Sequence, residues 1–257
     1  MSFALVTGAT SGIGRAFAEQ LAERGMQIIL VARDLERLVA LSDSLRGDGH
    51  EVIAADLSRD EGCAEVMGRL DRDDAPVNLL VNAAGVGTSD SFPRVSLADE
   101  EGQLDLNVRA ALRLCWAAAR AMERRGRGAI INVASTAAIW STGTYAASKA
   151  WLSAMTAGLR AALSDGPVQV LCVVPGFTRS EFHARSGVDN SGVRTWLWLT
   201  PERVAEDALV ALNADRGVCI PARRYRLLLG SMRLLPLPVR QRLLRILAPL
   251  RPQATIK

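Results

Sequence analysis

Several residue types are scarce in this sequence, and their scarcity excludes some classes of protein. Neither a disulfide framework nor a metal site is predicted, because the four cysteines are widely spaced, form no C-x-x-C pair and have no histidine near them. No uninterrupted apolar stretch reaches the roughly 18–20 residues of a membrane-spanning helix. The chain has no internal repeat and no low-complexity linker. The strand-like residues Phe3 to Val6 leave no room for a signal peptide, so a cytoplasmic location is expected.

Apolar runs alternate with helical stretches along the chain. Hydrophobic residues make up 49% of the 257 residues, and strands covered on both faces of a parallel sheet are continuously apolar. The apolar runs are 28–32, 77–81, 129–133 and 168–174, and the helical stretches include 35–45, 100–124 and 145–163. This alternation predicts an α/β fold with a doubly wound parallel sheet.

A glycine-rich turn follows the first apolar run. Residues 7–14 are Thr-Gly-Ala-Thr-Ser-Gly-Ile-Gly, and a helical pattern continues from Arg15 to Arg24. Glycines let the backbone turn tightly and let a pyrophosphate approach the helix N-terminus, where free N–H groups and the helix dipole favour an anion. The candidate cofactor-binding residues are Gly8, Thr10, Ser11, Gly12, Ile13 and Gly14. For the motif alone, a turn that only closes a β-α unit is the alternative.

Only two of the 31 basic residues are lysines, and one of them, Lys149, stands four positions after Tyr145. The compact ammonium of lysine can fill a role that the planar guanidinium of arginine cannot. If residues 145–164 form a helix, this spacing places the phenol and the ammonium on one face. The cation would then lower the phenol pKa from about 10, and such a phenol can exchange a proton with a carbonyl oxygen. Alone, Y-x-x-x-K is a weak signal.

Six sequence elements follow one another in the order typical of a known family. They are T-G-x-x-x-G-x-G at 7–14, Asn82-Ala83-Ala84-Gly85, Asn107, Ser135, Tyr145 with Lys149, and Pro175-Gly176. Together they resemble the short-chain dehydrogenase/reductase family in its compact single-domain form, and the match runs through most of the chain. The interval from Ser135 to Tyr145 is shorter than is usual in the family, so Thr136, Ser141 and Thr142 remain alternative hydroxyls.

The resemblance implies a Rossmann-type sheet of about seven strands with helices on both faces. It also implies an oxidoreductase that interconverts a ketone and a secondary alcohol. Tyr145 would protonate the carbonyl oxygen as the nicotinamide delivers hydride, while Lys149 would lower the pKa of Tyr145 and bind the nicotinamide ribose. Ser135 would hold the substrate oxygen, and Asn107 would position a water that links Lys149 to solvent.

Further contacts with the cofactor are implied by the resemblance. The residues are Asn82, Ala83 and Gly85 after the apolar run 77–81, Pro175, Gly176 and Thr178 after the run 168–174, and Asp56 with Leu57 beside the adenine. For Asp56 a plain role as a turn or cap residue is the alternative. The family commonly forms dimers or tetramers, so a homodimer or homotetramer through helices 100–124 and 145–163 is expected.

The end of the second predicted strand indicates which nicotinamide cofactor is used. NAD-specific sites place an acidic side chain about 20 residues after the glycines, whereas here Arg33 lies 19 residues after Gly14. A guanidinium at this point would bind a 2′-phosphate, with a contribution from Ser11. NADP(H) is therefore the expected cofactor and NAD(H) the less favoured one. The alternative makes Asp34 the ribose ligand and Arg33 a solvated charge.

In this family the substrate is set by the loop that follows the apolar run 168–174, which here is residues 179–200. It carries Phe182, Trp196, Leu197, Trp198 and Leu199, and Trp140 lies in the shortened loop before Tyr145. Aromatic side chains over an active site would favour a lipophilic substrate such as a fatty-acyl, steroid-like or aromatic ketone. Packing in the core or between subunits explains them equally well.

Residues 221–257 are a basic C-terminal extension of the domain predicted for residues 1–220. They carry eight Arg and one Lys without an acidic residue, so this segment has a charge of +9 and the rest of the chain −5. Leucines between the arginines, interrupted by prolines, predict short basic amphipathic helices. Three hypotheses remain open: attachment to an anionic membrane surface, a cover over the substrate entrance, and an oligomer contact or solvated helix. Nucleic-acid binding is not expected, because Tyr225 is the only aromatic residue in the segment.

Three functions are compatible with the chain as a whole. The favoured one is an NADP(H)-dependent ketone reductase or alcohol dehydrogenase. A dinucleotide-binding regulatory or scaffold protein would keep the fold without turnover, but the intact Tyr145, Lys149 and Asn107 argue against it. A sugar-nucleotide epimerase of the longer related families shares Y-x-x-x-K, but the glycine spacing and the chain length disfavour it.

Overall fold

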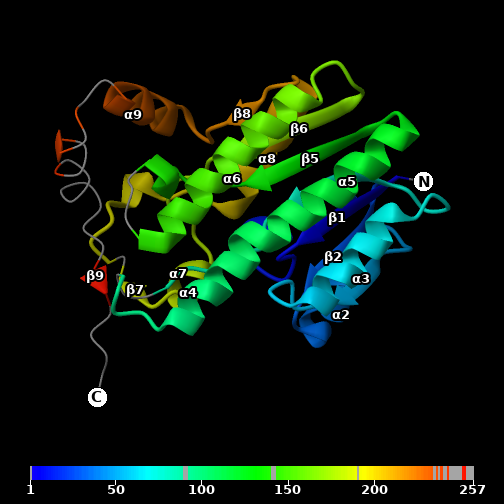
Figure 1. The fold of residues 1–257 in the computed structure, drawn as a ribbon, viewed down its shortest axis with the longest axis horizontal. Helices are drawn as coiled ribbons and strands as arrows, with labels where there is room; N and C mark the ends of the chain where they lie inside the picture. The colour runs from blue at the N-terminus through cyan, green and yellow to red at the C-terminus, as the bar shows by residue number, and fades with distance from the viewer. Residues whose placement is uncertain are drawn as a thin grey trace.

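The structure is a computed structural model that describes residues 2–88, 92–139, 143–189, 191–233, 236, 238–239, 242 and 251–252. A twisted sheet lies between two layers of helices (Figure 1). The predictions made for Trp140, Ser141 and Thr142 lie outside the described residues.

Seven parallel strands form the main sheet, in the order β3-β2-β1-β4-β5-β6-β8. Their bounds are β1 Phe3–Thr7, β2 Gln27–Ala32, β3 Glu51–Ala54, β4 Val77–Asn82, β5 Gly128–Val133, β6 Val168–Val173 and β8 Val218–Cys219. The strand order reverses between β1 and β4, and in this class of sheet ligands bind beyond the carboxyl ends of the strands at such a point. The predicted Rossmann-type fold is confirmed.

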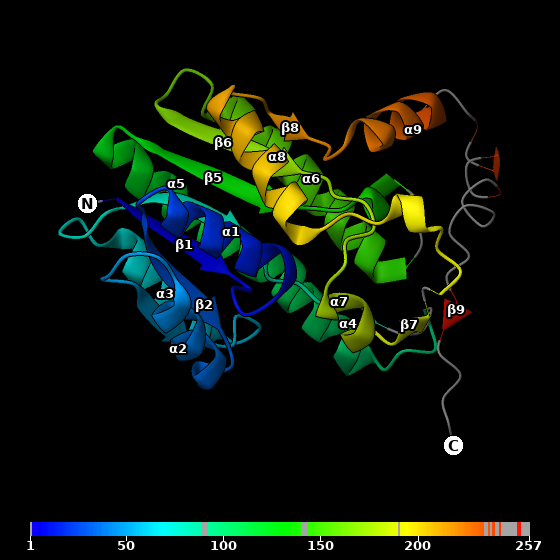
Figure 2. The same ribbon diagram turned by 180° about the vertical axis from the view of Figure 1, so that it is seen from behind.

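Helices cover both faces of the sheet, as Figures 1 and 2 show from opposite sides. Buried side chains of α1, α2 and α8 pack on one face, and those of α3, α5 and α6 pack on the other. The helices are α1 Gly12–Glu23, α2 Leu35–Ser44, α3 Asp60–Asp71, α4 Leu97–Leu104, α5 Ala111–Arg125, α6 Gly143–Ala162, α7 Glu181–Arg185, α8 Pro201–Asn213 and α9 Arg223–Arg233. A short antiparallel pair, β7 Val188–Asp189 with β9 Arg251–Pro252, lies apart from the main sheet.

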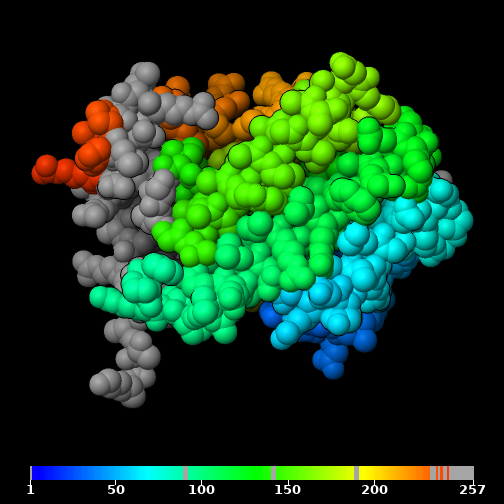
Figure 3. Space-filling model, viewed as in Figure 1, coloured from blue at the N-terminus to red at the C-terminus, as the bar shows by residue number. Residues whose placement is uncertain are grey.

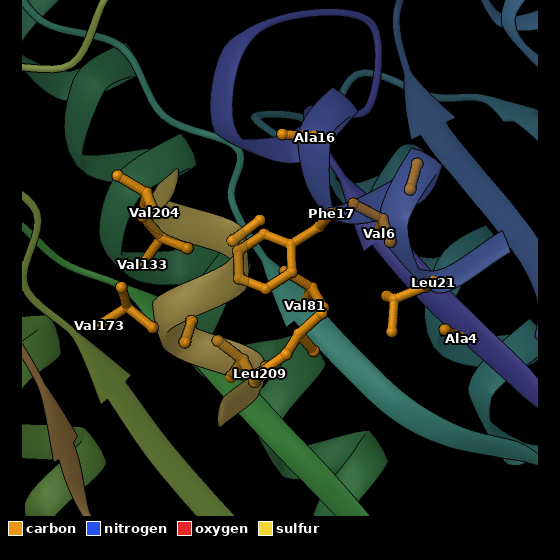
Figure 4. Close-up of a cluster of buried hydrophobic side chains, with 14 of the residues drawn as sticks. Ala4, Val6, Ala16, Phe17, Leu21, Val81, Val133, Val173, Val204 and Leu209 are labelled. Atoms are coloured by element: carbon orange, nitrogen blue, oxygen red, sulfur yellow. The ribbon is translucent and has the colours of Figure 1, made fainter. Parts of the chain in front are cut away.

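The core on one face is centred on Phe17 of α1, which has no exposed surface. Its ring lies between strand residues such as Val81 and the α8 residue Leu209 (Figure 4). Alternate residues of β1 enter different clusters, because Val6 faces α1 whereas Leu5 faces α5. Burial on both faces explains why the strands are continuously apolar in sequence.

The first helix of the C-terminal extension, α9, packs on the main domain. Tyr225 and Leu229 are each 2% exposed, and Tyr225 belongs to the same buried cluster as α1 and α8. The division at residue 220 stays a prediction, but residues up to Leu229 share the core of the preceding domain. No helix among the described residues is both long and apolar enough to cross a membrane.

Candidate active site

The turn between β1 and α1 has the backbone of an anion-binding site. Gly8 and Gly12 have φ values of +65° and +54°, a left-handed conformation that glycine adopts without strain. At Gly14 a Cβ would lie 2.3 Å from the carbonyl oxygen of Gly8, so glycine is needed for α1 to start this close to β1. Ser11 precedes α1 without a side-chain cap, and the first turn contains no acidic residue. The helix N-terminus therefore suits a phosphate.

A cavity of about 380 Å³ opens beside this turn, and Thr10, Ser11 and Gly12 line it. Three arginines also line it: Arg15 of α1, Arg37 of α2 and Arg179 after β6. The Arg37 guanidinium donates two hydrogen bonds to Glu181, at 2.8 and 3.1 Å, and one to the Thr10 carbonyl oxygen at 3.0 Å. The sequence did not single out Arg37, because its partner Glu181 lies 144 residues away.

The structure separates the two candidate contacts for the adenosine ribose. Asp34 is the N-cap of α2, where its carboxylate accepts a hydrogen bond from the Arg37 N–H at 3.1 Å. Arg33 is exposed at the end of β2. The Asp34 carboxylate thus caps the helix, whereas contact of Arg33 with a ligand stays a prediction.

Asp56 forms a turn ahead of α3, so its alternative role as a turn residue is present. Its carboxylate accepts hydrogen bonds from the Ser58 N–H at 3.0 Å and the Ser58 hydroxyl at 2.7 Å. Partial burial raises the pKa of Asp56, but these hydrogen bonds and the charges of Arg33 and Arg59 outweigh it, so the pKa lies below its usual value. Leu57 is buried in the core. Contact of this pair with adenine stays a prediction.

Thr7 connects the glycine-rich turn to the segment after β4. Its hydroxyl oxygen accepts hydrogen bonds from the N–H groups of Ala83 at 3.1 Å and Ala84 at 3.0 Å. A Cβ at Gly8 would lie 3.0 Å from the backbone of Ala84, so the two segments touch. Thr7 was not among the predicted site residues, although it is the first residue of the glycine motif.

Tyr145 and Lys149 lie on α6, next to Ser135 at the end of β5. The Ser135 hydroxyl lies close enough to the phenol of Tyr145 to lower its pKa, so the shortened interval still brings the two together. The Lys149 ammonium lies 5.9 Å from the centre of the Tyr145 ring. It also donates a hydrogen bond to the Val133 carbonyl oxygen at 2.9 Å. The helical i, i+4 arrangement expected for the pair is present.

The pKa values of this pair differ from the expectation. Burial raises the pKa of Tyr145 to about 12, and the nearby Ser135 hydroxyl offsets only part of this effect. Burial lowers the pKa of Lys149 to about 8. The expected lowering of the Tyr145 pKa by Lys149 is therefore wrong for the protein alone, because loss of hydration dominates and Lys149 is not among the groups that shift this pKa.

Asn107 lies in a π-helical turn, Asp105–Ala110, between α4 and α5. Its Oδ1 accepts a hydrogen bond from the Val86 N–H at 3.0 Å, and its Nδ2 donates to the Val86 carbonyl oxygen at 2.8 Å and to Ser148 Oγ at 3.2 Å. A Cβ at Gly85 would lie 3.1 Å from Asn107 Oδ1 and 3.3 Å from the Lys149 ammonium. Gly85 therefore lets the segment after β4 approach both residues. Single π turns are frequent at functional sites.

A buried polar network supports the site from within the sheet. Asn82 donates to Asn132 Oδ1 at 2.9 Å, and Asn132 donates to Thr156 Oγ1 of α6 at 3.0 Å. The Asn82 side chain thus points into the core, so any contact of Asn82 with a cofactor would use its backbone. Sequence reasoning missed Asn132, although a polar residue inside an apolar strand was a usable signal. Among the described residues, no group of three or more potential metal ligands could hold an ion.

The segment after β6 covers Tyr145. Phe182 of α7 places its ring centre 5.4 Å from that of Tyr145. Trp198 packs in the same loop, and the centre of its ring lies 5.2 Å from that of His183 and 5.8 Å from that of Phe177. Burial lowers the pKa of His183.

The backbone after β6 joins this loop to the serine. The carbonyl oxygen of Pro175 accepts a hydrogen bond from the Thr136 N–H at 2.9 Å. Thr178 is buried, and its hydroxyl donates to the Gly176 carbonyl oxygen at 3.0 Å. Its contact with a carboxamide stays a prediction.

The chain is similar in sequence and in structure to several known proteins. The chain is 31% identical over 179 residues to a 3-oxoacyl-[acyl-carrier-protein] reductase of Bos taurus, which covers 68% of this chain and 75% of the relative. A short-chain dehydrogenase from Sphingobium yanoikuyae in complex with NADPH superposes with a TM-score of 0.80, at 33% identity, over 91% of this chain and 94% of that one. For the bulky-bulky ketone specific alcohol dehydrogenase from Comamonas testosteroni the TM-score is 0.75 and the identity 28%, over 92% and 95% of the two chains.

The family assignment follows from these matches and from the site. The sequence pattern of the short chain dehydrogenase family matches residues 2–190, which include the glycine motif, Asn107, Ser135 and the Tyr145–Lys149 pair. The protein belongs to the short-chain dehydrogenase family of oxidoreductases.

Proposed function

We propose that the protein is an NADP(H)-dependent oxidoreductase that interconverts a ketone and a secondary alcohol. The observation that carries the proposal is the meeting of Tyr145 with Ser135 and Lys149, in a domain that also has the glycine-rich turn before α1. The bound cofactor would supply or accept the hydride, and the protein residues would handle the proton and the orientation of the substrate.

Tyr145 has the protonation state that the reducing direction needs. With a pKa of about 12, its phenol is protonated at neutral pH and can donate to a carbonyl oxygen. Ser135 would donate a second hydrogen bond to the same oxygen. Lys149 is charged below its pKa of about 8 and would stabilise negative charge that develops on Tyr145 as the proton leaves.

The preference for NADP(H) rests on Arg33, which is exposed at the end of β2, and on Asp34, which caps α2. The match to a structure that contains NADPH supports it. The test is a fluorescence titration of the purified protein with NADPH and NADH. We expect NADPH to bind more tightly than NADH. Arg33→Ala should weaken NADPH binding by about 10 to 100-fold, the range expected for loss of a hydrogen bond between charged groups.

A matched control uses Arg127→Ala, because Arg127 is exposed next to the amino end of β5, at the opposite edge of the sheet. An equal loss of NADPH affinity in Arg33→Ala and Arg127→Ala would contradict a specific contact of Arg33 with the phosphate. Failure of the wild type to bind either nucleotide would contradict the proposed function. Binding without turnover of any ketone would instead support a regulatory or scaffold protein of the same fold.

A lipophilic substrate is supported by the aromatic side chains near Tyr145. Phe182 contacts the Tyr145 ring, while Phe177 and Trp198 pack in the same loop. The similarity to an alcohol dehydrogenase specific for bulky-bulky ketones agrees with this. A panel of ketones of increasing size, assayed by NADPH oxidation, tests it. Higher kcat/KM for small polar ketones than for acyl, steroid-like or aromatic ones would contradict the proposal.

A homodimer or homotetramer through α5 and α6 is also proposed. Leu112 and Trp116 on α5 are 47% and 54% exposed, and Figure 3 shows both helices on the same face of the molecule. The exposed face of α6 carries small residues, including Ala154 and Ala157, that allow close packing. Light scattering of the wild type and Trp116→Glu tests this, and a monomeric wild type would refute it.

Contact of the basic extension with a membrane surface remains a further proposal. Arg223, Arg226 and Leu227 are exposed on α9, and cations beside an apolar side chain suit anionic lipid. Truncation before α9 would remove the buried Tyr225, so the better test is Arg223→Glu with Arg226→Glu in the full chain. The fraction of protein that sediments with phosphatidylglycerol vesicles should be lower for this variant than for wild type. An unchanged fraction would refute the membrane contact.

A further inference from the structure

Tyr225, the single aromatic residue of the C-terminal extension, connects three segments of the chain. Its side chain leaves α9 and is 2% exposed. The hydroxyl oxygen accepts a hydrogen bond from the Phe177 N–H at 3.0 Å. The same hydroxyl donates to the Leu197 carbonyl oxygen at 2.6 Å. One phenol thus holds the start and the end of the loop that covers Tyr145.

The ring of Tyr225 lies directly against Gly176. A Cβ at this glycine would fall 1.9 Å from the ring carbon that bears the hydroxyl, and 2.2 and 2.4 Å from the two adjacent ring carbons. Any side chain at position 176 would therefore displace the phenol. The backbone of Gly176 has no positive φ recorded, so close approach by the ring is the reason for glycine here.

The segment held by Tyr225 leads to the catalytic serine. The Pro175 carbonyl oxygen accepts a hydrogen bond at 2.9 Å from the N–H of Thr136, the residue after Ser135. On the other side, the Leu199 N–H donates to the Phe177 carbonyl oxygen at 2.7 Å. Residues 175–177 therefore lie between the phenol of Tyr225 and the end of β5 that carries the serine.

We propose that Tyr225 is a positioning residue, which holds residues 175–177 and the loop ending at Leu197 in the geometry that the nicotinamide end of the site requires. The inference rests on the proposed function, and it means that α9 helps to set the geometry of the site. Tyr225 acts through Gly176 and Phe177 and needs no contact with the substrate. Loss of its hydroxyl would remove one hydrogen-bonding partner from each of the two backbone groups while keeping the ring against Gly176.

The test compares Tyr225→Phe with Leu229→Ala in the full chain. Leu229 is buried on the same helix, one turn further on, so its truncation weakens the packing of α9 without removing a hydrogen bond to Phe177 or Leu197. Amide hydrogen exchange without nucleotide, the Kd for NADPH, and kcat and KM for a reactive ketone are measured. In Tyr225→Phe we expect exchange of residues 176–179 and 197–199 to rise about 10-fold and NADPH to bind roughly 5 to 10-fold more weakly, as for one lost hydrogen bond.

Leu229→Ala should lower the unfolding temperature and leave these exchange rates and the Kd for NADPH close to wild type. Equal changes in the two variants would show a merely structural role and overturn the inference. Unchanged exchange and binding in Tyr225→Phe would also overturn it while the proposed function stands. A wild type that binds neither nucleotide would overturn the proposed function, and the role of Tyr225 in it.

Discussion

Replacement of Lys149 by methionine should make the ligand-free protein more stable while it abolishes ketone reduction. The Lys149 side chain is buried, with 5% exposure, and its ammonium has one recorded hydrogen bond, to the Val133 carbonyl oxygen. Burial of this charge is unfavourable, which is why the pKa falls. Methionine has a similar length without the charge, so it removes the cost of burial.

The size of the effect follows from the pKa. The pKa of Lys149 falls from 10.5 to about 8, and each pH unit of difference corresponds to about 1.4 kcal/mol, so the charged form costs the fold about 3 kcal/mol. Loss of the hydrogen bond to Val133 destabilises the methionine variant by about 1 kcal/mol, which reduces its gain in stability. A net gain of about 2 kcal/mol is expected at pH 7, or about 5 °C in unfolding temperature for a chain of this size.

The pH dependence separates this explanation from a general packing effect. Between pH 8 and 10.5 the unfolded state of the wild type binds more protons at Lys149 than the folded state does, so its stability rises with pH in this window. Lys149→Met lacks this titration. The stability difference should therefore be largest below pH 8, pass through zero as the pH rises, and favour wild type by about 1 kcal/mol above pH 10.5, where only the hydrogen bond to Val133 still contributes.

Urea unfolding at several pH values, followed by circular dichroism, measures the difference. Lys149→Arg is the control, because its guanidinium stays charged throughout this range and cannot gain stability as the pH rises. A methionine variant less stable than wild type at pH 7, or a difference that does not change with pH, would refute the reasoning.

Three other substitutions test the site. Tyr145→Phe should lower kcat by about 10²- to 10⁴-fold, because the general acid is lost, while NADPH titration shows retained binding; retained turnover would contradict the assignment. Phe182→Ala, which removes the ring 5.4 Å from that of Tyr145, should raise the KM for a lipophilic ketone by roughly 5 to 10-fold without changing the Kd for NADPH; an equal change in both would contradict a substrate contact. Gly14→Ala should destabilise by about 1–3 kcal/mol in urea unfolding and impair NADPH binding, because its Cβ would lie 2.3 Å from a backbone oxygen. The control Gly68→Ala, which has open space and lies within a helix, should be neutral or stabilising.

The sequence alone determined the features that depend on local periodicity. Continuous apolar runs separated by helical stretches specified the parallel sheet, because strands buried on both faces cannot alternate with polar residues. Glycines 8, 12 and 14 specified the tight turn before α1. The i, i+4 spacing put Tyr145 and Lys149 on one face of α6, since helix geometry fixes that relation.

Tertiary structure decided the features that depend on partners distant in sequence. Asn82 turns into the core because Asn132, 50 residues away, accepts its hydrogen bond. The pKa of Tyr145 rises because the chain buries the phenol, an effect that the helical spacing alone does not contain. In the sequence Tyr225 is an isolated aromatic residue in a basic segment, yet in the fold its hydroxyl accepts a hydrogen bond from Phe177, 48 residues away. Local sequence sets the backbone periodicity, whereas the packing of the complete chain sets which buried polar groups meet and how far each is removed from water.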